Sequence, residues 1–144
     1  MNEKLVVFVV SLIFSAIGYA EAQQTTKVLP RIGFISPSGA PGSPSPLFNA
    51  LQQGLSDLGY IDDKNIAIVH QYAEGRLDRM PALMNELVHH KVDVIVAVTN
   101  VVIRAAKEAT KTVPIVIVTS VDPVAAGYVE SFARPGGNIT GLAN

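Results

Sequence analysis

Polar side chains that could bind a small ligand follow several apolar runs of this sequence. Ser36 closes the run RIGFIS, Thr99 and Asn100 follow VDVIVAV, and Ser120 and Asp122 follow VPIVIVT. If these runs are parallel strands, loops and helix N-termini converge beyond their carboxyl ends, which is where open α/β sheets bind ligands. We therefore expect Ser36, Thr99, Asn100, Ser120 and Asp122 to line a ligand-binding crevice.

Each candidate has a chemical role, and most have a structural alternative. Thr99 or Asn100 can cap the helix that follows and leave its first backbone N–H groups free for an anion, or they are only caps. Asp122 can pair with a ligand's ammonium group, but Asp before Pro is also common in turns. Ser36 offers a hydroxyl beside a Gly/Pro-rich loop. Glu74 is a weaker candidate, because acidic residues after an edge strand are usually only solvated.

Motifs for catalysis, nucleotide binding or metal binding are missing from the sequence. The spacing of Gly33, Gly39 and Gly42 does not match GxGxxG, no Lys follows a glycine loop as a P-loop requires, and there is no GxSxG. His89 and His90 are adjacent at a predicted helix end, so they point apart and are expected on the surface. The chain has no Cys, hence no thiolate metal site or disulfide. We expect a binding protein with no cofactor and no metal, not an enzyme.

Four strands and three helices must position these residues. Apolar runs predict strands over 31–36, 65–71, 92–98 and 113–119. The second alternates with polar residues, which indicates a strand near a sheet edge, whereas the β-branched third and fourth are typical of strands buried on both faces. Strands and helices alternate along the chain, which predicts a doubly wound parallel α/β sheet. Beyond the fourth strand, residues 124–132 are a candidate short helix and the remainder is turn-rich.

The helices are predicted from apolar residues at helical spacing. The first ends at Gly59, a typical C-terminal capping residue. The second has Asp78 as a candidate N-cap, which leaves Pro81 in the first turn, where its missing N–H is tolerated. The apolar stripes are Leu47, Phe48, Leu51, Leu55 and Leu58 in the first helix, Leu77, Met80, Leu83, Met84, Leu87 and Val88 in the second, and Val101, Val102, Ala105, Ala106 and Ala109 in the third.

The N-terminal segment has the composition of a secretory signal. Residues 5–17 are almost continuously apolar, and Ala20 and Ala22 are small residues at the positions that a signal peptidase reads. We expect cleavage before Gln23, followed by a short linker over 23–30. The alternative is a membrane span, which needs roughly 20 apolar residues, whereas this run ends at Gly18. The mature protein is then expected to be soluble and exported to the periplasm.

Composition limits the function classes further. The net charge is −1 at pH 7, so the chain lacks the excess of positive charge with which proteins bind nucleic acid. A hydrophobic content of 49% with 16% charged residues excludes disorder as the overall state. After the expected cleavage, residues 23–144 are long enough for one compact domain, over 31–144, but not for two.

Several segments together resemble a known family. They are RIGFISPS, LQQGLSDLGYIDDKNIAI, QYAEGRLDRMPALMNELV, VDVIVAVTN and TVPIVIVTSVDPVAAGYVESFARPGGNITGL. The chain is similar, from Arg31 to its last residue, to the ABC transporter substrate-binding proteins of tryptophan/tyrosine-type importers. The stretch 122–142 is the most specific part of the resemblance.

The resemblance implies a Rossmann-like N-terminal lobe of a type I periplasmic binding protein. Such proteins have two α/β lobes that close on a ligand such as an aromatic amino acid. The resemblance implies that Ser36, Thr99, Asn100, Ser120 and Asp122 contribute one wall of the cleft, and that the protein is a monomer that delivers its ligand to an ABC permease in the membrane. Many relatives carry a small Gly/Thr/Pro run after the third strand, where this sequence has Val-Thr-Asn, so ligand preference is expected to differ. The second lobe is missing, so the single lobe is expected to bind weakly.

Two other functions remain open at the sequence level. A ligand-sensing domain of a regulatory or signalling protein shares this fold, but it is normally fused to a helix-turn-helix or a kinase, and the export signal argues against the first fusion. An enzyme on the same scaffold needs a nucleophile or a base triad, for which the sequence has no matching motif.

Overall fold

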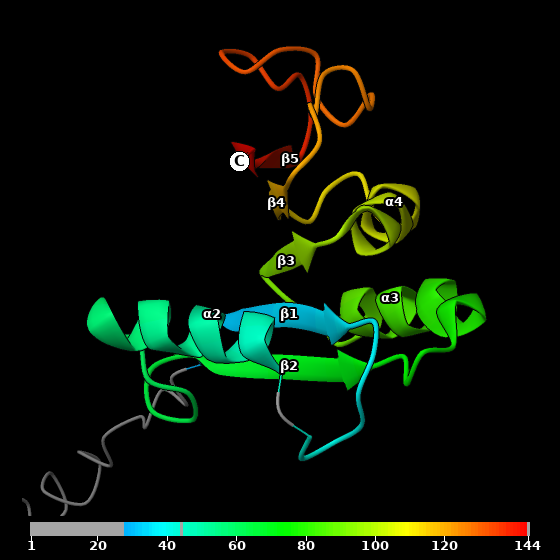
Figure 1. Ribbon diagram of the computed structural model, residues 1–144. Helices are drawn as coiled ribbons and strands as arrows, with labels where there is room; N and C mark the ends of the chain where they lie inside the picture. The colour runs from blue at the N-terminus through cyan, green and yellow to red at the C-terminus, as the bar shows by residue number, and fades with distance from the viewer. Residues whose placement is uncertain (1–27, 44, 144) are drawn as a thin grey trace, which may run out of the picture.

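The computed structural model describes residues 28–43 and 45–143. It contains a single sheet of five parallel strands, with helices packed on both faces (Figure 1). The strands are β1 (Arg31–Ser36), β2 (Ala67–Tyr72), β3 (Val94–Val98), β4 (Ile115–Thr119) and β5 (Ile139–Ala143). Their order is β2-β1-β3-β4-β5, with every pairing parallel. The doubly wound α/β prediction is confirmed, as is the edge position of the second strand. The predicted signal peptide over 1–22 and residues 23–27 of the predicted linker lie outside the described residues.

Helices cover the two faces of the sheet unequally (Figure 1). The helix α2 (Pro46–Asp57) lies along β1 and β2 on one face, while α3 (Met80–His89) and α4 (Asn100–Ala109) pack on the other. The main core lies between the sheet and the α3–α4 layer. It includes the buried side chains of Ile35, Met84, Leu87, Ile95, Ile103 and Ile117. Burying apolar area in this layer supplies the largest stabilising contribution to the fold.

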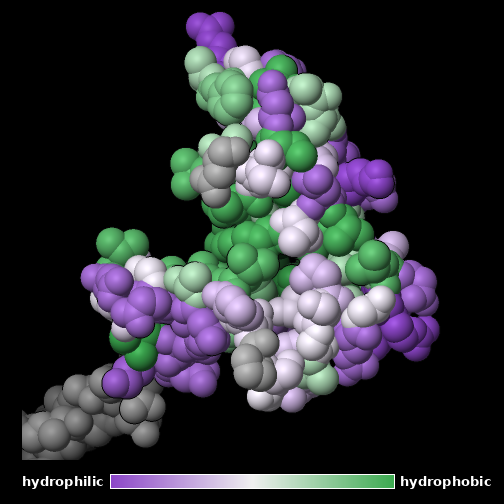
Figure 2. Space-filling view, in the orientation of Figure 1, coloured by the Kyte–Doolittle hydropathy of each residue, from purple (hydrophilic) through white to green (hydrophobic). Residues whose placement is uncertain are grey.

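The apolar face of β3 and β4 that is turned away from α4 is only half-buried. Residues alternate between fully buried and half-buried along both strands, and the half-buried ones include Val94, Val96, Val116 and Val118. Figure 2 shows apolar surface over this region, beside α2. The prediction that these strands are buried on both faces is therefore wrong within the described residues, because α2 lies over β1 and β2 and leaves this part of the sheet uncovered.

The start of the second helix differs from the prediction. The helix α3 begins at Met80, and Arg79 occupies the N-cap position, where its side chain makes no capping hydrogen bond. Asp78 lies instead in the short 3-10 helix η1 (Leu77–Arg79) and forms an exposed ion pair with Arg76 at 3.1 Å. The N-cap prediction for Asp78 is wrong because an additional turn precedes the helix. Pro81 does lie in the first turn of α3, as predicted.

The C-terminal part also departs from the prediction. Residues 124–132 form turns and not a helix: the carboxylate of Asp122 accepts the N–H groups of Val124 and Ala125, and Gly127 has a φ of +69°. Residues 139–143, expected to be turn-rich, form β5. The side-chain amide of Asn138 donates to the carbonyl of Val113 at 2.7 Å, which anchors β5 beside β4.

Among residues 28–43 and 45–143, the structure has no helix long and apolar enough to cross a membrane.

Candidate functional site

The predicted site residues lie at one edge of the sheet. Ser36 is the last residue of β1, Thr99 follows β3, and Ser120 follows β4. Because β1, β3 and β4 are adjacent and parallel, their carboxyl ends open onto the same edge. The topology therefore brings together segments that lie far apart in the sequence.

A cavity lies beside Ser36, at the N-terminus of α2. Its volume is about 250 Å³, and its polar lining consists of hydroxyl-bearing residues and one glycine, namely Ser36, Ser38, Gly39, Ser43 and Ser45. Ser45 is the N-cap of α2 and accepts the N–H of Phe48 at 3.4 Å. The N-terminus of α2 and the hydroxyl groups of Ser36, Ser38 and Ser45 border this space, an environment that favours a negatively charged or electron-rich ligand group. The hydroxyl of Ser43 donates instead to the carbonyl of Ala40.

Thr99 and Asn100 join β3 to α4 in an unusual conformation. Thr99 occupies the N-cap position of α4, but its side chain makes no capping hydrogen bond and its φ is +96°. The prediction that the Thr99 side chain caps the helix, one of the two roles considered for this residue, is therefore wrong. Asn100 opens the helix, and its side-chain oxygen accepts the hydroxyl of Thr119 at 3.3 Å. Both Thr99 and Asn100 are exposed, so their remaining polar atoms are open to a ligand.

The polar residues that follow β4 and β2 differ in the hydrogen bonds and ion pairs that they form within the protein. Ser120 is exposed at the end of β4. One carboxylate oxygen of Asp122 accepts two backbone N–H groups, from Val124 at 2.8 Å and Ala125 at 3.2 Å. Asp122 therefore stabilises a turn, which was the structural alternative to ligand binding. Glu74 is exposed and lies 3.4 Å from Arg79, which fits a solvated surface residue.

His70 is a residue of this region that the sequence analysis did not assign. Its Nε2 lies 2.8 Å from the hydroxyl of Ser36, and its Nδ1 lies 3.1 Å from the hydroxyl of Tyr72. The ring stacks between Phe48 and Tyr72, with centroid distances of 3.9 and 4.1 Å. Burial lowers the pKa of His70. The alternation of the strand put His70 on the same face as Tyr72, but its contacts with Ser36 and Phe48 depend on the tertiary structure.

The Ser36–His70 contact has the length of a nucleophile–base pair, but its surroundings are those of a structural pair. The second nitrogen of His70 contacts the phenol of Tyr72, whereas a catalytic triad usually has a carboxylate there. Burial also disfavours the imidazolium that general-base catalysis requires. The geometry suits a fixed hydrogen-bonding group better than a reacting one.

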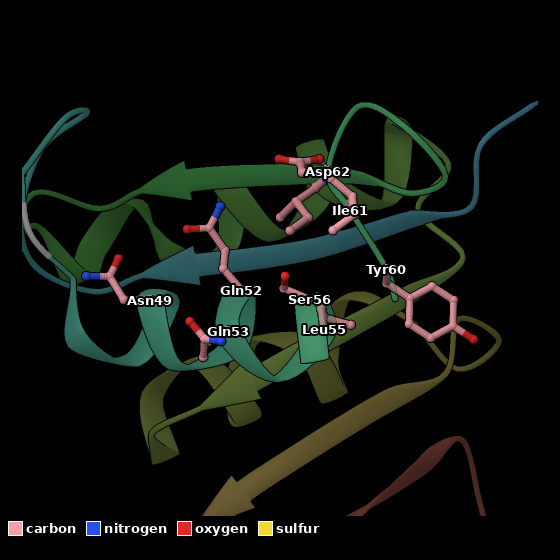
Figure 3. A pocket seen from close by; sticks show the side chains of 9 residues that line it. Asn49, Gln52, Gln53, Leu55, Ser56, Tyr60, Ile61 and Asp62 are labelled. Atoms are coloured by element: carbon pink, nitrogen blue, oxygen red, sulfur yellow. Dashed lines mark hydrogen bonds between the residues drawn. The ribbon is translucent and has the colours of Figure 1, made fainter. Parts of the chain in front are cut away.

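A second hollow, of about 400 Å³, lies between α2 and the segment before β2 (Figure 3). Gln52 and Ser56 extend from the helix, and Asp62 belongs to the opposite segment. One carboxylate oxygen of Asp62 accepts the backbone N–H of Ile68 at 2.8 Å, so it is already engaged within the fold. None of the predicted site residues lines this hollow, and we do not assign it to the ligand site.

Comparison with known proteins identifies relatives of this α/β unit. The family model described as ABC transporter substrate binding protein matches residues 45–144. A tyrosine-binding protein of Clostridioides difficile is 37% identical over 92 residues, which cover 64% of this chain and 27% of that protein. The ligand-free, open structure of a substrate-binding protein with adhesive properties from Clostridium difficile superposes with a TM-score of 0.69 at 29% identity, covering 81% of this chain and 39% of the other.

A further solved structure contains a ligand. It is an ABC domain from Streptococcus pneumoniae in complex with L-Trp, with a TM-score of 0.69 and 26% identity over 80% of this chain and 38% of the other. The chain thus spans about a quarter of the curated relative and well under half of the solved structures. Since the family model covers more than two thirds of the sequence, the chain belongs to the family of ABC transporter substrate-binding proteins.

Proposed function

We propose that this chain forms one wall of the ligand cleft of an extracytoplasmic binding component of an ABC importer. The observation that carries the proposal is the family match over 45–144, combined with the convergence of Ser36, Thr99 and Ser120 at one sheet edge. A second α/β unit supplies the opposite wall, and closure of the two units buries the ligand. The binding component acts as a monomer, without cofactor and without catalysis, and delivers the ligand to a membrane permease.

The ligand in this proposal is a small organic molecule, most simply an amino acid with an aromatic side chain. The support is the description of one relative as tyrosine-binding and the L-Trp in the complex of another. The hydroxyl groups and the α2 N-terminus around the 250 Å³ cavity suit a carboxylate. Asn100 and Asp122 contribute further polar atoms on the same wall, and Asp122 has one carboxylate oxygen left for an ammonium group.

Export of the protein is part of the same proposal. Its support is the sequence of residues 1–22, with an apolar run and small residues before Gln23. The test is expression in a Gram-negative host followed by mass spectrometry of the periplasmic fraction. A mature N-terminus at Gln23 is expected, and retention of Met1 in a membrane-bound product would contradict cleavage.

Titration of the isotope-labelled chain with L-tyrosine and L-tryptophan, followed by NMR, tests ligand binding. Because one wall buries a ligand only partly, we expect weak binding in fast exchange, with the largest shifts at Ser36, Thr99, Asn100 and Ser120. Loss of one hydrogen bond in Ser36→Ala is expected to weaken binding about fivefold, equivalent to roughly 1 kcal/mol.

The matched control is Ser56→Ala, since Ser56 lines the 400 Å³ hollow on the same helix layer and is exposed. This variant should bind like the wild type. Shifts confined to Gln52, Ser56 and Asp62 would transfer the site to that hollow, and the absence of shifts with both amino acids would contradict the aromatic ligand.

A further inference from the structure

His70 is held in a fixed orientation by aromatic rings on the α2 side of the sheet. Phe48 from α2 and Tyr72 from β2 lie against its faces, and Phe34 from β1 meets it edge-on at a centroid distance of 5.2 Å. Both ring nitrogens are engaged, Nε2 with Ser36 and Nδ1 with Tyr72. The imidazole thus connects the edge strand to the last residue of β1, beside the cavity.

The hydrogen-bonding partners determine which nitrogen carries the proton. A neutral imidazole has one N–H donor and one acceptor nitrogen. A phenol is more acidic than an aliphatic hydroxyl, so we assign Tyr72 as the donor to Nδ1. In this assignment the N–H is on Nε2 and donates to the oxygen of Ser36. Ser36 keeps its own proton for a different acceptor.

We propose that His70 is a positioning residue for the ligand, because its Nε2–H holds the Ser36 oxygen and leaves the Ser36 proton for an oxygen atom of the ligand. The inference rests on the proposed function, in which Ser36 faces the ligand. An oxygen atom of a ligand in the cavity beside Ser36 can accept this proton. In the ligand-free protein, the hydroxyl oxygen of Ser45, which lines the same cavity, lies 3.4 Å from that of Ser36. With His70 in this role, Ser36 binds a hydrogen-bond acceptor of the ligand in preference to a donor.

The charges around His70 leave the imidazole neutral at pH 7. The only charged residue of β1 is Arg31 and that of α2 is Asp57, and both lie at the end of their element remote from His70. Asp62, in the segment before β2, accepts the backbone N–H of Ile68. The titratable group in contact with the ring is the phenol of Tyr72, and burial lowers the pKa of His70. The Nε2–H form therefore persists through the neutral range.

Two amide variants of the full chain distinguish the contributions of the two ring nitrogens of His70. The amide nitrogen of Gln reaches the position of Nε2, whereas that of Asn reaches only the position of Nδ1, so His70→Gln keeps a donor toward Ser36 and His70→Asn does not. Both variants lose the aromatic stack, which makes them a matched pair for stability, checked by thermal unfolding. His89→Asn, on the exposed end of α3, serves as the unaffected control.

The probe is L-tryptophan, titrated by NMR at pH 7.5. We expect His70→Asn and Ser36→Ala each to weaken binding about fivefold, and the double variant to lose no more than either one, because both remove the same hydrogen bond to the ligand. His70→Gln should retain most of the wild-type affinity. Additive losses, or equal losses in the Gln and Asn variants, would overturn the inference.

Nitrogen-15 spectra of the histidine rings in the ligand-free chain provide a reading that does not depend on binding. They should show His70 protonated at Nε2, and a proton on Nδ1 would overturn the inference directly. If the wild-type chain binds neither L-tryptophan nor L-tyrosine, the proposed function fails for these ligands, and the ring spectrum alone decides whether His70 holds the Ser36 oxygen.

Discussion

Thr99 has a backbone conformation that is costly for its residue type. Its φ of +96° and ψ of +142° lie in a region that glycine adopts readily, whereas a β-branched side chain there is strained. Such strain typically costs about 1–3 kcal/mol and is concentrated at functional sites. The position of Thr99, between a central strand and the N-terminus of α4, fits this association.

Replacing Thr99 by glycine should separate stability from binding. We expect Thr99→Gly to raise the free energy of unfolding by about 1 kcal/mol, because relief of strain exceeds the entropic cost of glycine. Binding of L-tryptophan should weaken, since a side chain that we propose to contact the ligand is removed. The control Thr112→Gly, at an exposed position without positive φ, should lower stability. Chemical denaturation measures both variants, and a destabilised Thr99→Gly would contradict the strain.

His70 should make stability depend on pH. Burial lowers its pKa in the folded state below the ordinary value of 6.5, so the unfolded chain binds the proton more readily. The stabilisation is fully present above pH 6.5 and is lost as the pH falls through the folded-state pKa. We expect a lower melting temperature at pH 5 than at pH 7.5, and a smaller difference in His70→Gln. An equal difference in the two proteins would show that other groups cause it.

At the scale of elements, β3 has one fully buried face and one half-buried face. Ile95 is fully buried in the α3–α4 core, while Val96 is half-buried on the opposite face of the strand. A buried side chain contributes through area removed from water and through packing without a cavity. Adjacent residues of the same strand should therefore differ strongly in their contribution to stability.

Alanine substitutions at these two positions test this asymmetry. Ile95→Ala is expected to lower the free energy of unfolding by about 2–5 kcal/mol, and Val96→Ala by less than half of that. Urea denaturation of the two variants gives the comparison. Similar losses in the two variants would contradict the asymmetry.

At the scale of the whole molecule, buried apolar side chains are distributed unevenly between the two helix layers. The α2 helix has no fully buried residue, whereas Val102, Ile103, Ala105 and Ala106 of α4 are buried against the sheet. Elements with few buried apolar side chains open with a smaller free energy than the global unfolding. The wall that carries the 250 Å³ cavity thus includes the less stable layer.

Native-state hydrogen exchange should show this difference. We expect the amides of α2 to exchange through local opening, at a lower free energy than those of β3 and α4, which exchange only on global unfolding. If saturating L-tryptophan is bound at the α2 N-terminus, the protection of α2 should rise more than that of α4. Equal protection of α2 and β3 in the free chain would contradict the uneven distribution.

Local patterns in the sequence determined most of the fold. Four strands, three helices and the parallel α/β class follow from the spacing of apolar residues, because side-chain direction repeats every two residues in strands and every 3.6 in helices. The same patterns predicted that Ser36 ends one parallel strand and that Thr99 and Ser120 follow two others, whereas the order of these strands in the sheet came from the structure. The positions of these strand ends along the chain therefore needed no tertiary information, while the participation of the residues in binding remains a prediction.

Long-range pairing decided the rest. The strand β5 contains Thr140 and Gly141 in a turn-rich sequence and forms because its backbone pairs with β4. His70 contacts Ser36 across 34 positions of the chain, and no local pattern specifies such a contact. The positive φ of Thr99 likewise arises at the junction of β3 and α4. Sequence periodicity reports only which face of an element a residue occupies, so the partners on that face, and with them the hydrogen bonds of the site, were decided by the tertiary structure.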